Sequence, residues 1–312
     1  MVKRKIEPLL RGDSIGIVAP AGVVHKPSIE AGIKFLKEQG FRIKLGDHVY
    51  SREGYLAGSD EQRADDLNKM LADNEIKAVF CARGGYGSVR ILPYMDLKSF
   101  SGNPKIIMGF SDITVLLLHV LNKTQTVTFH GPVVSKLNAD SPPETVECML
   151  EVLRGDIDVD LARFLPEDQP VRVLRHGNAT GCLMGGCLSM LQTVVGTDLQ
   201  INLKNKILFW EEVGEQVYRI DRMIDHLSRA GFFDNLKGMI IGKLTGCFKN
   251  QKTDEERFLG IISKYFGSYD YPIIYNLPIG HSKLQLTLPE GGTCYLNTRK
   301  SEVIINSGLK KP

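Results

Sequence analysis

A serine stands where a strand is expected to turn sharply into a helix, and its position suggests nucleophilic chemistry. Ser111 follows the apolar run 106–110 and precedes a helical run that begins near Ile113. A serine on such a turn holds its hydroxyl above the sheet, where the next backbone N–H groups can stabilise an oxyanion. Gly109 matches the first glycine of a G-x-S-x-G elbow, but Ile113 replaces the second. Ser111 is therefore a candidate nucleophile, and the alternative is a serine that only caps the helix.

A glycine-rich segment, ARGGYG at 82–87, follows another expected strand. Adjacent glycines let the backbone approach a ligand closely. A backbone N–H of Gly84 or Gly85 could therefore complete an oxyanion hole with the N–H of Asp112. The segment could also cradle a phosphate, although it lacks the Lys-Ser/Thr of a P-loop and the spacing of a dinucleotide loop. A plain glycine-rich turn is the third interpretation.

A nucleophilic serine needs a base, and the base usually needs an acid that orients it. Of the seven histidines, His130 and His281 both follow strand-like runs and flank a glycine, and spacing does not choose between them. Glu211 and Glu212 follow the apolar run 207–210. Adjacent residues on an extended chain point to opposite faces, so only one of these carboxylates can enter a given site. The alternative for this pair is an ordinary solvated strand edge.

The elements that must position these residues alternate between short apolar runs and amphipathic stretches. This alternation predicts an α/β fold with a mostly parallel, doubly wound sheet, whose ligands bind beyond the carboxyl ends of the strands. The expected strands are 14–20, 41–45, 76–81, 105–110 and 126–129, and the expected helices are 28–39, 60–73 and 113–121.

The pattern changes in the second half of the chain. Residues 155–170 are rich in Asp and Pro and indicate a linker. We therefore expect an N-terminal α/β domain at 1–154 that carries the nucleophile, a linker at 155–175, and a C-terminal domain at 176–312 that carries the glutamate and the histidine. In the C-terminal domain we expect strands at 181–184, 207–210, 239–241 and 273–275, an amphipathic helix at 220–230, and an antiparallel tail at 284–288, 294–296 and 303–305 that turns at 289–292.

Composition excludes several classes of function. The chain has 312 residues and a net charge of +3, which is too balanced to argue for nucleic acid. The extra basic residues at the two ends are interpreted as solvated termini. No apolar stretch approaches the roughly 20 residues of a membrane helix, and no signal-peptide core is present. The six cysteines form no C-x-x-C pair, which favours reduced thiols in a cytoplasmic protein over a zinc site or disulfides. The terminal basic residues are Lys3, Arg4, Lys5, Lys310 and Lys311.

Seven motifs, taken in order, resemble those of the LD-carboxypeptidases, or muramoyltetrapeptide carboxypeptidases, over nearly the whole chain. These are serine peptidases with a Ser-His-Glu triad. The motifs are GDSIGIVAP (12–20), ARGGYG (82–87), GFSDIT (109–114), FHGP (129–132), GG (185–186), LFWEE (208–212) with YRIDR (218–222), and LPIGH (277–281).

The resemblance implies a role for each site residue. The nucleophile falls on Ser111, the general base on His281, and the glutamate on Glu211, with Glu212 one register step away. The oxyanion donors fall on the backbone of Gly85 and Asp112. Cys187 follows the GG motif where many family members have asparagine, which puts a polar contact at that position in doubt.

The resemblance also implies the fold and the assembly. We expect a flavodoxin-like N-terminal domain, a smaller C-terminal domain built around a β-barrel, and a site in the cleft between them. No metal or cofactor is required. A cytoplasmic homodimer that acts on a small muropeptide is expected, with no nucleic acid or membrane partner.

The expected reaction is hydrolysis of the bond between an L-centre and a terminal D-alanine in peptidoglycan tetrapeptides. Arg83 is a candidate for binding the terminal carboxylate, although a structural ion pair would explain it equally well. The alternative function is an immunity-type serine peptidase that cleaves peptide-nucleotide antibiotic conjugates. A catalytically silent binding protein is disfavoured because Ser111, Glu211 and His281 are all present. A dinucleotide-binding protein is disfavoured because its fingerprint is missing.

Overall fold

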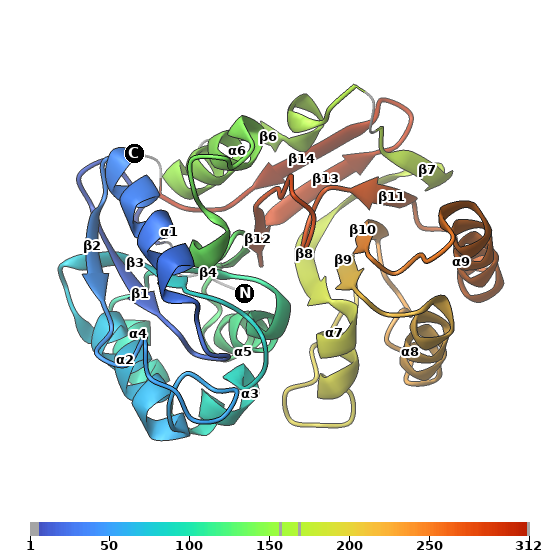
Figure 1. Ribbon diagram of the computed structural model, residues 1–312. Coiled ribbons are helices and arrows are strands. Elements are labelled where there is room, and N and C mark those ends of the chain that lie inside the picture. Colours follow the sequence, from blue (N-terminus) through green and yellow to red (C-terminus); the bar gives the residue numbers. More distant parts are fainter. Residues whose placement is uncertain (1–5, 156–157, 168–169, 311–312) are drawn as a thin grey trace.

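The computed structural model describes residues 6–155, 158–167 and 170–310, which form two sheets with helices packed on them (Figure 1). Lys3, Arg4, Lys5 and Lys311 lie outside the described residues, as do four positions of the expected linker. Lys310 forms an ion pair with Glu7, so this basic residue ties the end of the described chain to its beginning.

The first sheet contains the five parallel strands that the sequence predicts. Their order is β2-β1-β3-β4-β5, and one later strand, β12, extends the sheet antiparallel to β5. The strands are β1 (Ser14–Val18), β2 (Arg42–Leu45), β3 (Ile76–Cys81), β4 (Ile106–Gly109), β5 (Thr128–His130) and β12 (Leu288–Glu290).

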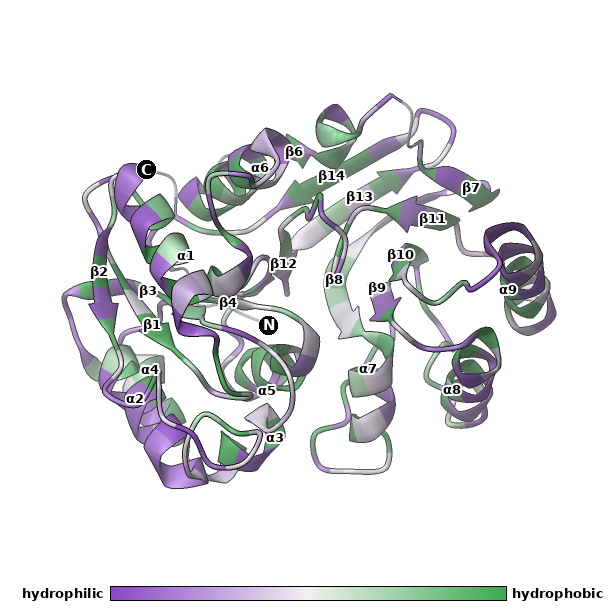
Figure 2. Ribbon diagram, in the orientation of Figure 1, coloured by the Kyte–Doolittle hydropathy of each residue, from purple (hydrophilic) through white to green (hydrophobic). Residues whose placement is uncertain are grey.

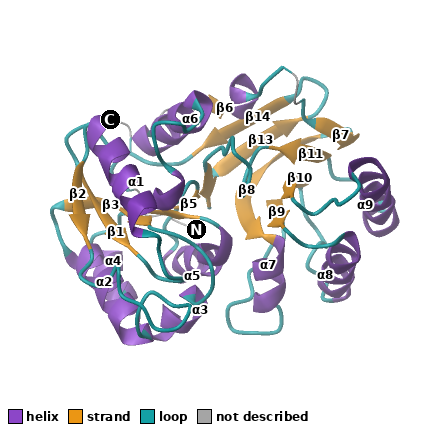
Figure 3. Cartoon of the chain, in the orientation of Figure 1, coloured by secondary structure: helices purple, strands orange, loops and turns teal. Residues whose placement is uncertain are grey.

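Helices cover both faces of this sheet, as the alternating pattern predicts (Figure 3). Apolar side chains of α1 (Lys26–Glu38) and α6 (Pro143–Arg154) pack on one face. Those of α2 (Asp60–Ala72), α4 (Leu97–Gly102) and α5 (Thr114–Thr124) pack on the other. Figure 2 shows mainly hydrophobic residues along β1 and β3, whereas α2 is mostly hydrophilic. The short α3 (Ser88–Ile91) follows the glycine-rich segment.

The second sheet has eight strands and curls into a half-barrel (Figure 1). Its centre is parallel and its flanks are antiparallel, in the order β6-β14-β13-β8-β9-β10-β11-β7. The helices α7 (Leu188–Val194), α8 (Val217–Arg229) and α9 (Gln251–Phe266) connect the parallel strands and pack against them. The strands are β6 (Val159–Asp160), β7 (Arg172–Arg175), β8 (Asn178–Cys187), β9 (Lys206–Val213), β10 (Gly238–Thr245), β11 (Ile273–Leu277), β13 (Thr293–Asn297) and β14 (Glu302–Asn306).

The C-terminal tail differs from the expected antiparallel arrangement. Residues 284–287 form no strand, and β12 pairs with β5 of the first sheet instead of with β13. The turn occupies 291–292 rather than the expected 289–292, because Pro289 and Glu290 belong to β12. It separates two strands that serve different sheets, and β12 covers an edge of the first sheet that would otherwise be open. The expected linker also contains β6 and β7, which are edge strands of the second sheet too short to show a period.

One buried apolar cluster joins the two sheets. It includes Phe129 and Leu288 of the first sheet together with Phe209 of the second and Ile279 of the loop after β11. The elements that carry the site are therefore held by a common core. Within the described residues, no helix has both the length and the apolar character needed to span a bilayer.

Candidate active site

Ser111 lies on a strained turn between β4 and α5. Its φ of 65° is in the left-handed region, which residues other than glycine seldom occupy and which often marks a functional position. Gly109 is required for this turn because a Cβ there would lie 2.8 Å from Cγ2 of Ile113. Ser111 does not cap the helix, since α5 begins without a side-chain cap. The capping interpretation is therefore wrong.

Two hydrogen bonds connect Ser111 to Glu211 through His281. Glu211 Oε2 lies 2.8 Å from His281 Nδ1, and His281 Nε2 lies 3.1 Å from the Ser111 hydroxyl oxygen. A carboxylate only accepts hydrogen bonds, so Nδ1 carries the proton and Nε2 is left to accept from the hydroxyl. The backbone N–H of His281 also donates to Glu211 Oε2, over 3.3 Å. The structure thus brings together the three residues that the resemblance singles out.

The approach of Glu211 to His281 depends on the glycine before the histidine. Gly280 has a φ of 83°, and a Cβ there would lie 2.1 Å from the carboxyl carbon of Glu211. Phe110 packs edge-on against the His281 ring with 4.8 Å between ring centroids. The imidazole is therefore held by its carboxylate and by an aromatic neighbour.

His130, the other histidine at a strand end, cannot serve Ser111. It is fully buried between Phe110 and Phe209, and neither ring nitrogen has a hydrogen-bond partner among the described residues. Burial lowers the pKa of His130 to about 3, and the charge of His281 acts in the same direction. The choice that spacing left open falls on His281.

The two adjacent glutamates point to opposite faces of β9, as their spacing predicts. Phe209 belongs to the core shared with the first sheet, whereas Trp210 belongs to the core under α7, α8 and α9. Glu212 Oε2 accepts from the backbone N–H of Ser189 at the start of α7, over 2.7 Å, and burial raises the pKa of Glu212. Both carboxylates are buried, so the interpretation as a solvated edge is wrong. Glu211 is the one that contacts His281.

Cys187 follows the GG motif, where many members of the resembling family have asparagine, and it lies beside these carboxylates. It pairs with Glu211 in the β8–β9 ladder, and its sulfur lies 3.5 Å from Glu212 Oε1. Burial and the two carboxylates raise the pKa of its thiol well above the ordinary value. The residue is therefore a neutral thiol next to the site.

The glycine-rich segment packs directly against the serine. A Cβ on Gly84 would lie 3.0 Å from Ser111 Cβ, which is tighter than most side-chain contacts, so glycine eases the close approach. Asp112 fixes the end of the segment, because its carboxylate accepts from the Ser88 backbone N–H over 2.8 Å and its carbonyl accepts from the Ser88 hydroxyl over 2.6 Å. The backbones of Gly85 and Asp112 thus belong to two segments that meet at Ser111.

Arg83 is exposed at the start of this segment. Its Nη1 donates to the carbonyl of Val23 over 2.6 Å. The sequence analysis offered a structural ion pair as the alternative role of Arg83. Among the described residues Arg83 forms no ion pair, and its structural contact is this hydrogen bond to the backbone.

A buried arginine organises the loops around the site, and the sequence analysis did not identify it. Arg63 on α2 is 1% exposed and donates to the carbonyls of Pro20 (2.6 Å), Gly87 (2.8 Å) and Gly58 (3.3 Å). It therefore ties together the loop after β1, the turn before α2 and the glycine-rich segment. One feature of the sequence indicates that Arg63 is buried. It lies four residues before Leu67, which is buried on the same face of the helix.

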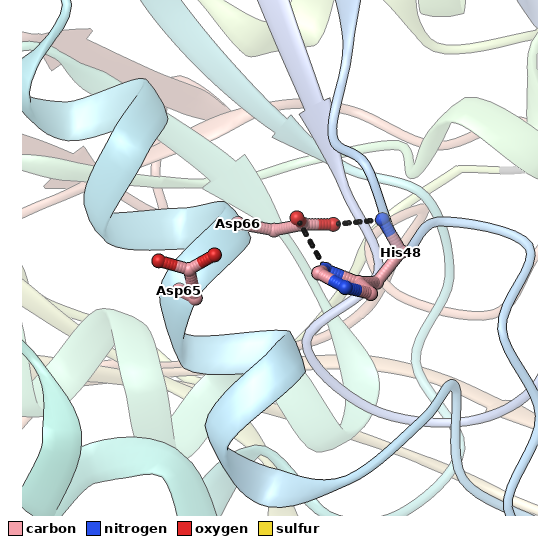
Figure 4. A group of neighbouring side chains, drawn as sticks. All are labelled: His48, Asp65 and Asp66. Carbon is pink, nitrogen blue, oxygen red and sulfur yellow. Dashed lines mark hydrogen bonds and ion pairs between the residues drawn. The ribbon is translucent and has the colours of Figure 1, made fainter.

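A group of potential metal ligands, His48, Asp65 and Asp66, lies where the turn after β2 meets α2 (Figure 4). Asp66 accepts from the backbone N–H of His48 over 2.8 Å, and its other oxygen lies 3.0 Å from the His48 ring. Asp65 is exposed and pairs with Lys69 at 2.8 Å. The two contacts between Asp66 and His48 hold the turn after β2 against α2, whereas the Asp65–Lys69 pair lies within α2, so the contacts of the group are structural.

Comparison with known proteins identifies the family to which the chain belongs. The LD-carboxypeptidase N-terminal domain matches residues 15–131, and the LD-carboxypeptidase C-terminal domain matches residues 180–296. The chain is 32% identical to a probable murein peptide carboxypeptidase of Bacillus subtilis, over 98% of this chain and 96% of that protein. It is 28% identical to the microcin C7 self-immunity protein MccF of Escherichia coli, over 91% and 90%. The crystal structure of the muramoyltetrapeptide carboxypeptidase from Oxalobacter formigenes matches with a TM-score of 0.80 and 26% identity, over 94% and 97%. The chain therefore belongs to the LD-carboxypeptidase family.

Proposed function

We propose that this protein is a serine carboxypeptidase that removes the terminal D-alanine from murein tetrapeptides by hydrolysing the bond to the preceding L-centre. The observation that carries the proposal is the hydrogen-bonded series Ser111–His281–Glu211. Membership of the family and the murein substrates in its members' names support the choice of substrate.

The reaction follows from the protonation of the histidine. The unprotonated Nε2 of His281 takes the proton of Ser111 as the serine oxygen attacks the scissile carbonyl carbon. Glu211 stabilises the imidazolium that forms. The same proton then passes to the leaving amino group of D-alanine, and water releases the acyl group from Ser111 by the reverse sequence.

The developing oxyanion would be bound by the backbone N–H groups of Gly85 and Asp112. The positive φ of Gly85 (111°) and the contact between Gly84 and Ser111 support this placement. Loss of one such donor typically lowers kcat by about 10²–10³-fold. Arg83 would bind the terminal carboxylate through the guanidinium nitrogens that do not contact Val23.

Mass spectrometry of the purified protein with an N-acetylmuramoyl tetrapeptide tests the proposal, with Ser111→Ala as the matched control. The expected result is loss of one alanine residue with the wild type and none with the variant. Loss with both proteins would contradict the role of Ser111. If neither protein acts, the murein assignment fails.

In that event the next substrates are aminoacyl-nucleotide conjugates, because the chain also resembles an immunity protein. A C-terminally amidated tetrapeptide tests the carboxylate site separately, since it should be cleaved poorly if Arg83 binds a carboxylate.

We extend the proposal to three expectations from the sequence. The strand order β2-β1-β3-β4-β5 supports a flavodoxin-like first domain. The domain boundaries at 1–154, 155–175 and 176–312 and a cytoplasmic homodimer complete the proposal. Sedimentation of the purified protein tests the dimer.

A further inference from the structure

A buried threonine joins the segment that carries Ser111 to the second sheet. Thr114 is the first residue of α5 and is fully buried, and its hydroxyl oxygen accepts from the backbone N–H of Cys187 over 3.2 Å. The backbone N–H of Thr114 in turn donates to the carbonyl of Ser111. Thr114 is therefore bonded both to the residue proposed as the nucleophile and to β8 of the second sheet.

The partner of this threonine lies opposite Glu211. Cys187 is the last residue of β8, and Glu211 is its register partner on β9. Together with the hydrogen bonds of the site, these contacts form a closed ring. Its members, in order, are Ser111, Thr114, Cys187, Glu211 and His281. Ser111 and Glu211 are thus connected by two routes, and only one of them passes through His281.

The two glycines before Cys187 let the threonine approach β8 this closely. A Cβ on Gly186 would lie 2.2 Å from Thr114 Cγ2 and 2.6 Å from its hydroxyl oxygen, so a side chain there would displace the threonine. A Cβ on Gly185 would lie 1.7 Å from the carbonyl oxygen of Phe209, so glycine also lets β8 lie close to β9. The GG motif, which the proposed reaction does not otherwise use, therefore fits the contact between α5 and β8.

This contact is independent of the side chain at position 187. The donor is the backbone N–H of Cys187, which a cysteine and an asparagine both supply. The departure from the family pattern at this position therefore leaves the hydrogen bond to Thr114 in place.

Apolar packing also holds α5 against the second sheet. Leu118 and Leu121 of α5 belong to one buried cluster with Met184 of β8 and Leu188 of α7. Such packing has no preferred direction. A hydrogen bond weakens steeply as its length or angle changes. The bond from Cys187 to Thr114 therefore fixes where the Ser111 turn stands relative to β8 and β9.

We propose that Thr114 is a positioning residue that sets the distance between Ser111 and the His281–Glu211 pair. Its kinetic consequence rests on the proposed function, whereas the geometry does not depend on the substrate. A misplacement of about 1 Å can lower the rate of an enzyme by about 10²-fold. Thr114 is fully buried, so it acts through Ser111 and does not contact substrate.

Thr114→Val tests the hydrogen bond, because valine has the shape of threonine but gives the Cys187 N–H no acceptor. In a D-alanine release assay on a murein tetrapeptide, kcat should fall by about 10–10²-fold. KM should stay within about twofold of wild type, because the residue does not contact substrate. Thr114→Ser keeps the hydroxyl and should retain kcat to within about threefold.

Thr124→Val is the matched control at the other end of α5. Thr124 is 6% exposed, and its hydroxyl accepts from the N–H of Thr126 over 3.3 Å and donates to the carbonyl of Val120 over 2.7 Å. Valine there also leaves a buried backbone N–H without its acceptor, so the urea midpoint should fall as it does for Thr114→Val. These bonds stay within one segment of the first sheet, so kcat should not change.

The Nδ1 proton of His281 gives a readout that needs no turnover. A histidine N–H that is bonded to a carboxylate resonates far downfield in the proton NMR spectrum, and its absence from His281→Ala assigns the signal. In Thr114→Val the signal should shift or broaden, because the ring loses the fixed spacing of its two partners. In Thr114→Ser and Thr124→Val it should keep its position.

Wild-type kcat or an unmoved signal in Thr114→Val would overturn the proposal. So would equal losses of kcat in Thr114→Val and Thr124→Val, or a Thr114→Ser protein as impaired as the valine variant. A rise in KM at constant kcat would assign the threonine to substrate binding and reject positioning. If the wild type releases no alanine, the proposed function fails, and the NMR comparison alone then decides the role of Thr114.

Discussion

Two histidines and two buried glutamates can be compared in the elements around the site, and only His281 is hydrogen-bonded to one of these glutamates, Glu211. His281 and Glu211 are joined by a hydrogen bond of 2.8 Å and reach Ser111. His130 and Glu290 lie on one face of the β5–β12 pair, since His130 is opposite Leu288 and Glu290 is two residues further along. Neither His130 nor Glu290 has a hydrogen bond of normal geometry from its side chain to the described residues.

The difference shows that burial alone does not make a catalytic group. Glu211 and Glu290 are both 0% exposed, but only Glu211 receives N–H donors from a histidine. Burial raises the pKa of Glu290 well above its ordinary value, against the opposing effect of the Gly185 backbone N–H. Burial also lowers the pKa of His130. His130 and Glu290 are therefore each held neutral, because desolvation penalises charge that no partner compensates.

The largest effect should separate the two histidines. His281→Ala removes the proposed general base and should lower kcat on a murein tetrapeptide by about 10⁵–10⁶-fold, as loss of a triad histidine does in other serine peptidases. His130→Leu has a similar volume and removes nitrogens that have no partner, so its kcat should stay within about threefold of wild type. Steady-state release of D-alanine measures both. A stable His130→Leu protein without activity would show that the buried histidine takes part in proton transfer.

The next effect should separate the two fully buried glutamates. Glu211→Gln should lower kcat by about 10³–10⁴-fold, because an amide can donate to Nδ1 and so favour the histidine tautomer whose Nε2 cannot accept the serine proton. Glu290→Gln keeps the shape of a group that is already neutral, so kcat should not change. Equal losses in the two variants would contradict the distinction between a connected and an isolated carboxylate.

These two neutral groups, His130 and Glu290, should also give the fold two opposite pH dependences. The folded-state pKa of Glu290 lies above its ordinary value of 4.5, so the stability that it contributes is present below pH 4.5 and is lost as pH rises through the folded-state value. The pKa of His130 falls from 6.5 to about 3, so its contribution is present above pH 6.5 and is lost as pH falls toward 3. Each slope should be about 1.4 kcal/mol per pH unit in the free energy of unfolding.

Urea denaturation between pH 4 and 9 measures both slopes against the wild type. The stability of Glu290→Gln relative to wild type should rise with pH, and that of His130→Leu should rise as pH falls. A constant difference across this range for either variant would mean that the group is not neutral in the folded protein.

The sequence predicts the parts of this arrangement that depend on local pattern. Strand and helix alternation predicts the first sheet, and the strand-to-helix position of Ser111 suggests its role. Opposite orientation of Glu211 and Glu212 follows from the period of an extended chain. The choice between His130 and His281 depends on long-range packing, which spacing does not contain, and it was made from a family resemblance.

Other features have no local signal. β12 crosses to the first sheet because that sheet has an open edge at β5, which is a property of the assembled fold. β6 has two residues, too few for a period to appear. The sequence pattern does not predict α9, because only three of its 16 residues are buried and its apolar stripe is weak. The buried residues are Phe258, Ile262 and Phe266.

The smallest effect should come from Glu212, the glutamate next to Glu211. Glu212 contacts the start of α7 through the backbone N–H of Ser189, and it does not contact His281. In Glu212→Gln the amide oxygen can still accept that N–H, so kcat should fall by no more than about threefold and stability by about 1 kcal/mol. Glu211→Gln makes the same chemical change on the other face of β9. Comparing the two variants in the same D-alanine assay therefore tests which face of the strand supports activity. If the two variants lost activity equally, the site would depend on the charge of the strand end rather than on the contact with His281.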